Sequence, residues 1–398
     1  MTRSQPIAVP LADGSAELFD WLARMRDEHP VWQEGEGAYH VFRYADVARV
    51  VSEPAVFSND ASRVNLELAN LVRGNINSMD PPEHGKLRKL VSQAFTPRTV
   101  AGLAPRIAEL TAELLDRVED DEFDLVDALT FPLPVIVIAE LLGVPASDRD
   151  LFRCWIDRLL SLQGLSSREE VNTDSPDFLE RIIEATHEMD GYLLEHCRDR
   201  RRNPQDDLIS KLTLAEVEGE RLTDDEVVKF ANVLFAAGNI TTTLLLGNAV
   251  MLLDGSPQVA ELRANRSLLA PVIEEVLRLR PPFTTVSRVT TREVEVAGTV
   301  IPANRMITPW LMSANQDERR FPDARRFDVH RDAGQHLAFS RGIHFCLGAP
   351  LARMEAKIAL GAMLDRYADI AIRWDEPISY HERGIWGAKT VPVRVRRN

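Results

Sequence analysis

The stretch that decides the fold is Phe339-Ser340-Arg341-Gly342-Ile343-His344-Phe345-Cys346-Leu347-Gly348, which presents one cysteine just before a helix. Gly342 allows a tight turn with positive φ, and residues 351–360 read as a helix that begins just after the sulfur. Cys346 is therefore expected at a helix N-terminus, where free N–H groups and the helix dipole stabilise a thiolate and lower its pKa. A thiolate held in this way is suited to ligate iron.

Three other roles are compatible with a lone cysteine to different degrees. A zinc site would need a Cys-x-x-Cys pair or a His pair at ligand spacing, and Cys154 and Cys197 stand alone in helical sequence. A buried structural cysteine is the commoner fate of a lone Cys. A Cys/His nucleophile stays open on composition, although nothing near Cys346 resembles a nucleophile elbow.

Length and composition restrict the architecture and the partners. With 398 residues and 45% hydrophobic content, the chain can bury a large core as one large domain or two average ones. The net charge of −14 argues against a nucleic-acid partner. The N-terminus has no apolar signal segment, and no window approaches the about 18 to 20 apolar residues of a membrane span. With three scattered cysteines and no dividing linker, we expect a single cytoplasmic domain over residues 1–398, monomeric and not attached to a membrane.

Helical patterns dominate the chain. Apolar residues recur at helical spacing in the ranges 15–29, 44–52, 82–95, 100–118, 131–142, 147–162 and 175–202. Strand-like alternation is confined to 31–42, 286–300 and 391–395. The predicted fold class is mainly α with small β-sheets.

The best-bounded helix starts at Thr223, which forms a capping box with Glu226, and stops near Gly255. It would contain about 31 residues and span about 46 Å. Because it is apolar on more than one side, we expect it to cross the interior of the protein.

The middle of this helix, residues 236–243, reads Ala-Ala-Gly-Asn-Ile-Thr-Thr-Thr and is unfavourable for a helix. Its Gly, Asn and Thr residues cost about 2 to 3 kcal/mol relative to alanine. Gly238 would let a flat ligand approach the backbone, and a Thr hydroxyl bonded to the carbonyl one turn earlier would widen the helix locally. We expect the resulting space to hold dioxygen and water.

The cysteine stretch resembles the signature of the cytochrome P450 haem-thiolate monooxygenases, Phe-x-x-Gly-x-x-x-Cys-x-Gly. Phe339, Gly342, Cys346 and Gly348 fill its four fixed positions. The resemblance implies the P450 fold, with haem b bound between the long central helix and the cysteine loop, and with Cys346 as the iron ligand. It also implies a soluble bacterial enzyme that hydroxylates or epoxidises a small, largely apolar molecule in secondary metabolism.

The long helix is similar to the family's Ala/Gly-Gly-x-Asp/Glu-Thr motif, but Ile240 occupies the acidic position. In the family the acid and the following Thr help to deliver protons to iron-bound oxygen. The resemblance therefore leaves Thr241, beside Gly238, as the hydrogen-bond donor. Asn239, Thr242 or ordered water would complete the path.

The missing acid keeps other functions open. A haem-thiolate enzyme that uses peroxide, or that catalyses oxidative coupling or dehydration, would not need the usual relay. A non-catalytic haem-binding sensor is a further alternative, although that role does not need Gly238 and Thr241. Independently of these functions, Ile240 could simply face helix packing.

Four residues are expected to hold the haem propionates. His84 and Arg88 lie four apart on one helical face, after Met79-Asp80-Pro81-Pro82, and can clamp an anion. By resemblance, Arg288 and His344 contact the same carboxylates, for which guanidinium and imidazole donors are suited.

Glu275 and Arg278 fit the family's Glu-x-x-Arg, which forms a structural ion-pair network with an arginine such as Arg326. The tetrapeptide alone is not specific. Two further copies of the spacing are expected to be exposed helical pairs: Glu195/Arg198 and Glu218/Arg221.

The resemblance also places the substrate and the electron donors. Residues expected at the substrate pocket are those in the range 62–76 together with Ile240, Thr284, Thr285, Ile385 and Trp386. Electrons are expected from NAD(P)H through a ferredoxin reductase and a ferredoxin, because no flavin domain is fused. A basic docking face could be formed by Lys86, Lys89, Arg98, Arg341, Arg353 and Lys357.

Overall fold

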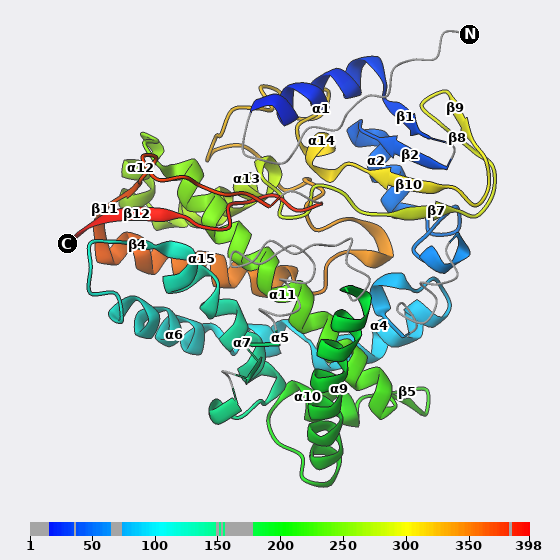
Figure 1. Ribbon diagram of the computed structural model, residues 1–398, viewed down its shortest axis with the longest axis horizontal. Coiled ribbons are helices and arrows are strands. Elements are labelled where there is room, and N and C mark those ends of the chain that lie inside the picture. The colour runs from blue at the N-terminus through cyan, green and yellow to red at the C-terminus, as the bar shows by residue number, and fades with distance from the viewer. Residues whose placement is uncertain are drawn as a thin grey trace.

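The 30-residue helix α11 (Asp224–Leu253) runs through the middle of the protein (Figure 1). Its start is the predicted capping box: the N–H of Glu226 donates to the Thr223 hydroxyl at 3.2 Å, and the N–H of Thr223 donates to the Glu226 carboxylate at 2.8 Å. The computed structural model describes residues 16–35, 37–64, 74–148, 151–152, 154–155, 178–381 and 384–398. Most of the helix predicted over 147–162 lies outside these residues.

Helices form most of the regular structure, as predicted. In the described residues they are α1 (Ala16–Glu28), α2 (Tyr44–Ser52), α4 (Glu83–Ala94), α5 (Pro97–Ala101), α6 (Ala104–Asp116), α7 (Pro132–Leu142), α9 (Phe178–Arg202), α10 (Leu208–Leu214), α11, α12 (Gln258–Ala264), α13 (Leu269–Leu279), α14 (Leu311–Asn315) and α15 (Ala349–Arg366). A π-helical segment, η4 (Val126–Thr130), precedes α7, and a 3-10 turn, η7 (Gly342–His344), lies in the cysteine stretch.

The strands form small sheets. They are β1 (Val31–Glu34), β2 (Ala38–Val41), β3 (Phe57–Ser58), β4 (Glu122–Asp124), β5 (Glu216–Val217), β6 (Glu220–Arg221), β7 (Arg288–Thr290), β8 (Val294–Val296), β9 (Thr299–Ile301), β10 (Met306–Pro309), β11 (Tyr367–Ile372) and β12 (Pro392–Arg397). The largest sheet has the order β1-β2-β10-β7-β3, and a second has the order β11-β12-β4. The predicted hairpin over 31–42 is β1 and β2, paired antiparallel around Gly35, whose φ is +59°.

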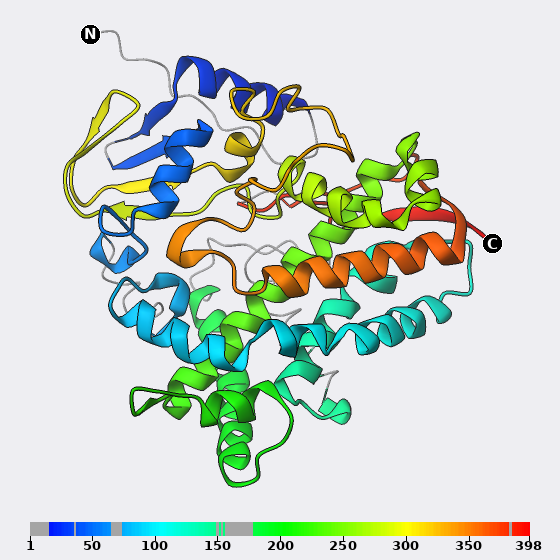
Figure 2. The same ribbon diagram turned by 180° about the vertical axis from the view of Figure 1, so that it is seen from behind.

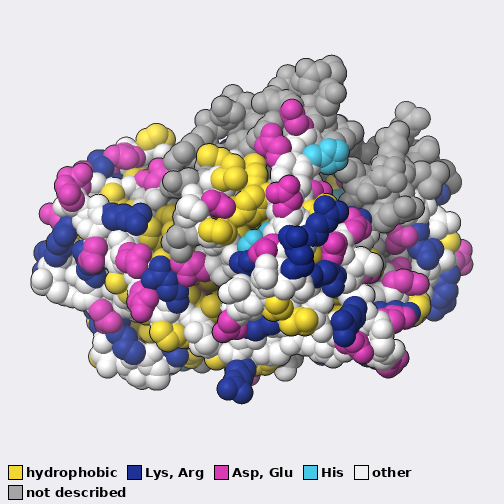
Figure 3. All heavy atoms as spheres, turned by 90° about the horizontal axis from the view of Figure 1, so that it is seen from below, with side chains coloured by type: hydrophobic (Ala, Val, Ile, Leu, Met, Phe, Trp, Pro, Cys, Tyr) yellow, Lys and Arg dark blue, Asp and Glu magenta, His cyan; other side chains and the backbone are white. Residues whose placement is uncertain are grey.

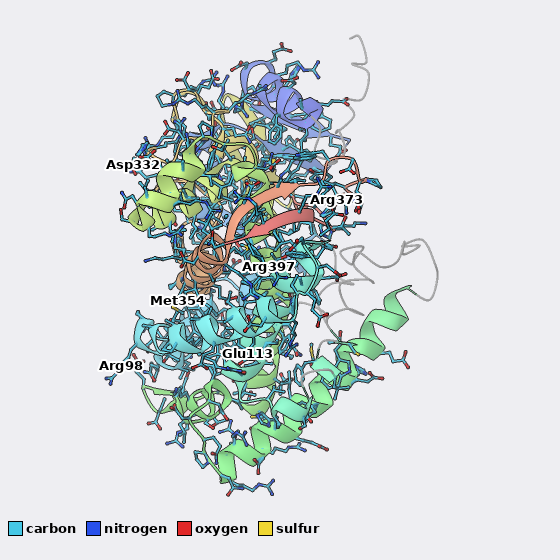
Figure 4. The ribbon with its side chains drawn as sticks, turned by 90° about the vertical axis from the view of Figure 1, so that its left-hand side faces the viewer. Arg98, Glu113, Asp332, Met354, Arg373 and Arg397 are labelled. Carbon is cyan, nitrogen blue, oxygen red and sulfur yellow. The ribbon has the colours of Figure 1, made fainter. Side chains whose placement is uncertain are left out.

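The main hydrophobic core surrounds α11. Helices α7, α9, α13 and α15 all pack against it, and α15 also packs on α6. Figure 4 shows this last contact: α15, labelled at Met354, lies above α6, labelled at Glu113. From behind, α15 and α4 both face the viewer, and the cysteine stretch passes between them (Figure 2).

Two smaller clusters support the β-rich part. One lies under the large sheet and includes Val41, Phe57 and Ile307. The other is aromatic: Trp21 of α1 packs edge-on against Phe42 and Trp310, at centroid distances of 5.4 and 5.3 Å. Such contacts add to the stability gained from burial alone.

Helix α11 is the one helix among the described residues whose length and composition would allow it to cross a membrane. Within the described residues, α11 has an 18-residue window of mean hydropathy 1.5, but 72% of that window is buried inside the protein. It is apolar on most sides because other helices surround it.

On the face seen from below, acidic and basic side chains are intermixed (Figure 3).

Candidate active site

The cysteine stretch forms a tight turn that packs on α2. Gly342 has φ +74°, and a Cβ there would lie 3.1 Å from Ser52 Cα and 3.3 Å from the Val51 carbonyl oxygen. Only glycine combines this backbone conformation with so close an approach. The N–H of Cys346 donates to the Phe339 carbonyl at 3.0 Å and closes the turn.

The sulfur lies at the start of α15, as predicted. Gly348 is the N-cap residue, and its missing Cβ would be 4.0 Å from Cys346 Sγ. The N–H groups of Gly348 and Ala349 bond to the sulfur and favour the thiolate, and Arg88 and Arg353 add positive charge.

The expected lowering of the Cys346 pKa is nevertheless wrong for the protein chain alone. Burial is the largest influence and raises the pKa of the thiol above its ordinary value, despite the N–H groups and the arginines. A coordinated metal cation reverses this balance, because a coordinating thiol is deprotonated outright. The site therefore fits a thiolate that a bound metal cation stabilises.

Four cationic or hydrogen-bonding side chains converge beside this turn. The rings of His84, on α4, and His344 lie 4.2 Å apart between centroids, and both Nε2 atoms are buried without a hydrogen-bond partner in the described structure. Burial, together with His84 and Arg288, lowers the pKa of His344 to about 3. Burial also lowers the pKa of the Arg288 guanidinium to about 10.

The two arginines of this group lack acidic partners. Arg88 donates to the Phe345 carbonyl at 2.7 Å, and Arg288 donates to the Ser287 carbonyl at 2.7 Å. Neither forms an ion pair with a carboxylate among the residues the structure describes. Arg288 is buried and Arg88 is half-buried, and cations in such surroundings without a carboxylate partner favour a bound anion. The two propionates of haem b fit this requirement.

The unusual middle of α11 forms an accessible stripe on an otherwise buried helix. Ala236 and Ala237 are exposed, and Val233 and Thr241 are half-buried. The Thr241 hydroxyl donates to the Ala237 carbonyl at 2.7 Å, as the sequence predicted. Ile240 is 5% exposed and belongs to the main core.

Gly238 is half-buried, and the side on which a Cβ would lie faces α7 rather than open space. A Cβ at Gly238 would overlap the end of the Ile138 side chain, so this glycine allows α7 to pack closely on α11. Ala237 is the small residue on the accessible stripe. Its position four residues before Thr241 was a usable signal, because residues four apart share a helix face.

Asn239 does not join Thr241. Two residues correspond to about 200° around the helix axis, so Asn239 faces the opposite side. It is fully buried, and its backbone carbonyl accepts from the Thr243 hydroxyl at 3.2 Å. The same hydroxyl donates to the Thr130 carbonyl of η4 at 3.0 Å. The proton-delivery role expected for Asn239 is therefore not supported by its position.

The residues expected at the substrate pocket divide into two groups. Thr285 is half-buried, whereas Thr284, Ile385 and Trp386 are buried, with exposures of 4, 3 and 1%. Trp386 belongs to the aromatic cluster under α1, where its ring lies 5.2 Å from that of Phe19. Its assignment to the pocket surface is therefore wrong.

Phe283 is the accessible residue of this segment. It is 39% exposed and forms an isolated β-bridge with Ile385. Its exposure could not be predicted, because a residue next to two prolines has no periodic pattern that shows which way its side chain faces. The middle of the expected pocket segment 62–76, residues 65–73, lies outside the described residues.

Glu275 and Arg278 form a buried ion pair, as expected. Both are fully buried, and Arg278 Nε donates to Glu275 at 2.7 Å. The third arginine is Arg331 rather than Arg326: Arg331 Nε donates to Glu275 at 3.1 Å, whereas the Arg326 side chain is 66% exposed and lies 3.7 Å from Asp328. Arg326 contributes only its carbonyl, which accepts from Arg278 at 3.4 Å.

Comparisons with known proteins identify the family. The cytochrome P450 family profile matches residues 10–377. The chain is 46% identical over 393 residues to cyclomarin C epoxidase of Salinispora arenicola, covering 97% of this chain and 98% of that protein. It is also 46% identical over 387 residues to erythromycin C-12 hydroxylase of Saccharopolyspora erythraea, covering 96% and 95%.

Solved structures agree as well. The open form of cytochrome P450 EryK from S. erythraea superposes with a TM-score of 0.92 at 44% identity and covers 98% of both chains. Ligand-free cytochrome P450 TbtJ1 superposes with a TM-score of 0.90 at 48% identity, over 98% of this chain and 100% of that one. The chain belongs to the cytochrome P450 family, the haem-dependent oxidoreductases that incorporate oxygen from dioxygen into their substrates.

Proposed function

We propose that this monooxygenase hydroxylates or epoxidises a preassembled natural product in bacterial secondary metabolism, and that Cys346 ligates its haem iron. The observation that carries the ligand assignment is the convergence at one turn: a sulfur at the start of α15 next to four donors without an anion. The substrate class is supported by relatives named as an epoxidase for cyclomarin C and a hydroxylase for erythromycin. We further propose that residues 1–398 act as one cytoplasmic, monomeric domain.

The haem and the chain contribute different parts of the chemistry. A thiolate-ligated haem supplies dioxygen activation, because the thiolate's electron donation favours O–O cleavage. Arg88 and Arg288 would neutralise the propionates, and the neutral imidazoles of His84 and His344 would donate hydrogen bonds to them. Cys346 would be held by its N–H bond to Phe339 and by the N–H groups at the start of α15.

On α11, Thr241 is the hydroxyl on the accessible stripe. Its proton is engaged in a hydrogen bond to the Ala237 carbonyl, so its oxygen can accept a hydrogen bond from water. Ile240 offers no carboxylate at this point. We therefore propose that protons reach this stripe through Thr241 and ordered water.

The electrons are proposed to come from NAD(P)H through a ferredoxin reductase and a ferredoxin. Two of the expected docking cations are already paired: Lys86 with Glu220 at 3.1 Å and Arg353 with Glu274 at 2.6 Å. Four more of the expected docking cations are exposed and form no ion pair within the described residues: Lys89, Arg98, Arg341 and Lys357. They would attract an acidic iron–sulfur protein.

Turnover under labelled dioxygen tests the proposal. Purified protein would be given NAD(P)H, ferredoxin and reductase with a panel of macrocyclic and polycyclic natural products, and products would be analysed by mass spectrometry. We expect one ¹⁸O atom from ¹⁸O₂ in the product. Turnover driven only by hydrogen peroxide, or a coupled or dehydrated product without the label, would contradict the proposal.

A further inference from the structure

One carboxylate on α13, that of Glu274, reaches the cysteine stretch by two routes. Arg353, on α15, donates to it through Nε at 2.6 Å and through Nη2 at 2.8 Å, which is a two-pronged contact. His336 Nε2 lies 3.2 Å from the same carboxylate. Burial raises the pKa of Glu274, but the bonds from Arg353 and His336 outweigh it and hold the pKa at about 2. Glu274 is therefore a fixed anion.

The first route ends on Phe339, the first residue of the cysteine stretch. The Arg353 guanidinium lies over the Phe339 ring at 4.5 Å from its centroid, a cation–π contact. The Phe339 carbonyl in turn accepts the N–H of Cys346 at 3.0 Å. The chain of contacts therefore runs from Glu274 through Arg353 and Phe339 to Cys346.

The second route anchors the same stretch one step earlier. The N–H of Ala338 donates to His336 Nδ1 at 3.1 Å, so Nε2 carries the ring proton and donates to Glu274. The His336 ring also lies 5.9 Å from that of Phe339. Glu274 thus holds both the backbone before Phe339 and the cation above its ring.

Its neighbour Glu275 has a different task. Glu275 binds Arg278, Arg331 and the N–H of Asp328, all of which lie before residue 336 or on α13 itself. The two adjacent carboxylates hold different segments, so the contacts of Glu274 are separate from the ion-pair network already described.

We propose that Glu274 is a positioning residue for the iron ligand: by orienting Arg353 on the Phe339 ring, it sets how strongly positive charge acts on the Cys346 sulfur. The positive charge of Arg353, held over the Phe339 ring, acts on the sulfur and favours the reduced, more negative haem. Without Glu274, the Arg353 side chain, which is 35% exposed, moves into water and that stabilisation is lost. The inference rests on the proposed ligation by Cys346.

The test is the haem reduction potential of Glu274→Gln, measured by spectroelectrochemical titration. At one fixed applied potential, we expect the ratio of reduced to oxidised haem in Glu274→Gln to be about threefold lower than in the wild type. If Glu274 acted only through its own charge, removing that charge would raise the ratio instead. A rise or no change overturns the inference.

Three further variants make the test specific. Glu261→Gln is the matched control, since Glu261 also pairs with a histidine, His330 at 3.0 Å, but on exposed α12; its potential should not move. In a Phe339→Leu background the fall caused by Glu274→Gln should disappear, and an equal fall there would overturn the role of the ring. If Glu274→Gln does not retain haem, Arg353→Lys replaces it in the test, because Lys keeps the positive charge but cannot form the two-pronged contact with Glu274. The reduction potential of Arg353→Lys should then fall, and an unchanged potential would overturn the inference.

The carbon monoxide spectrum separates the two proposals. If wild type lacks the band typical of thiolate-ligated haem, the ligation by Cys346 fails. If the band is present in every variant and the potentials do not change as stated, only the role of Glu274 fails.

Discussion

Replacing Glu275 by Gln should strongly destabilise the protein. The Glu275 carboxylate is fully buried and accepts from Arg278 Nε at 2.7 Å, Arg278 Nη2 at 2.8 Å and Arg331 Nε at 3.1 Å. Gln keeps the volume but removes the negative charge and turns an amide N–H₂ toward guanidinium donors. Removing one partner of a buried ion pair costs about 3 to 5 kcal/mol. Since domains are stable by about 5 to 15 kcal/mol, at least a fifth of the stability would be lost.

Glu195→Gln is the matched control, because Glu195 and Arg198 have the same Glu-x-x-Arg spacing. Glu195 is exposed on α9, and Arg198 lies 3.9 Å from Asp224 instead. This substitution should change stability by no more than about 0.5 kcal/mol.

Urea unfolding followed by circular dichroism, with haem absorbance as a second probe, measures both variants. Equal midpoints for the two variants, or a loss below about 1 kcal/mol for Glu275→Gln, would refute the argument from burial.

The remaining predictions concern the cysteine turn, α11 and pH. Gly342→Ala should lose bound haem, because φ +74° costs an L-residue about 1 to 2 kcal/mol and its Cβ meets the backbone of α2, whereas Gly348→Ala, at φ −78°, should load normally; equal haem absorbance per protein would contradict this. Thr241→Val should lower product formed per NAD(P)H about tenfold while Thr241→Ser retains it, and equal yields would remove the hydroxyl from the proton path. Ile240→Glu should change the same ratio, and an unchanged ratio would mean that this buried position has no part in proton supply. Burial lowers the pKa of His381 to about 4, so the neutral ring adds its full share to the free energy of unfolding above about pH 6.5, and about 3 kcal/mol of that free energy is lost as the pH falls toward 4. His381→Gln should therefore flatten the decline of the urea midpoint between pH 7.5 and 4.5, and an unaltered slope would contradict this role of His381.

Local features of the chain were predictable because the residues themselves impose them. The capping box at Thr223 and the positive φ of Gly342 follow from side-chain hydrogen bonding and from the absence of a Cβ. The hydroxyl of Thr241 bonds one turn back, as expected for Thr within a helix.

Features set by distant packing were not predictable. Gly238 makes room for Ile138, which is 100 residues away in sequence, and the pairing of Glu275 with Arg331 instead of Arg326 depends on how the intervening loop folds. Trp386 was placed at the substrate because its segment matched, but a short irregular segment carries no periodicity to show that its ring packs under α1.

The balance of forces on the sulfur was also not readable from sequence. The helix start and the nearby arginines are visible in the order of residues, and they do favour a thiolate. The extent of burial depends on the whole fold, and it is the larger influence on the pKa of Cys346.

X-ray absorption at the iron edge of the purified ferric protein tests most directly whether Cys346 ligates the haem iron. We expect one sulfur scatterer at bonding distance from iron in the wild type and none in Cys346→Ser. A first shell made only of nitrogen and oxygen in the wild type, or a sulfur signal that persists in Cys346→Ser, would show that another group holds the iron.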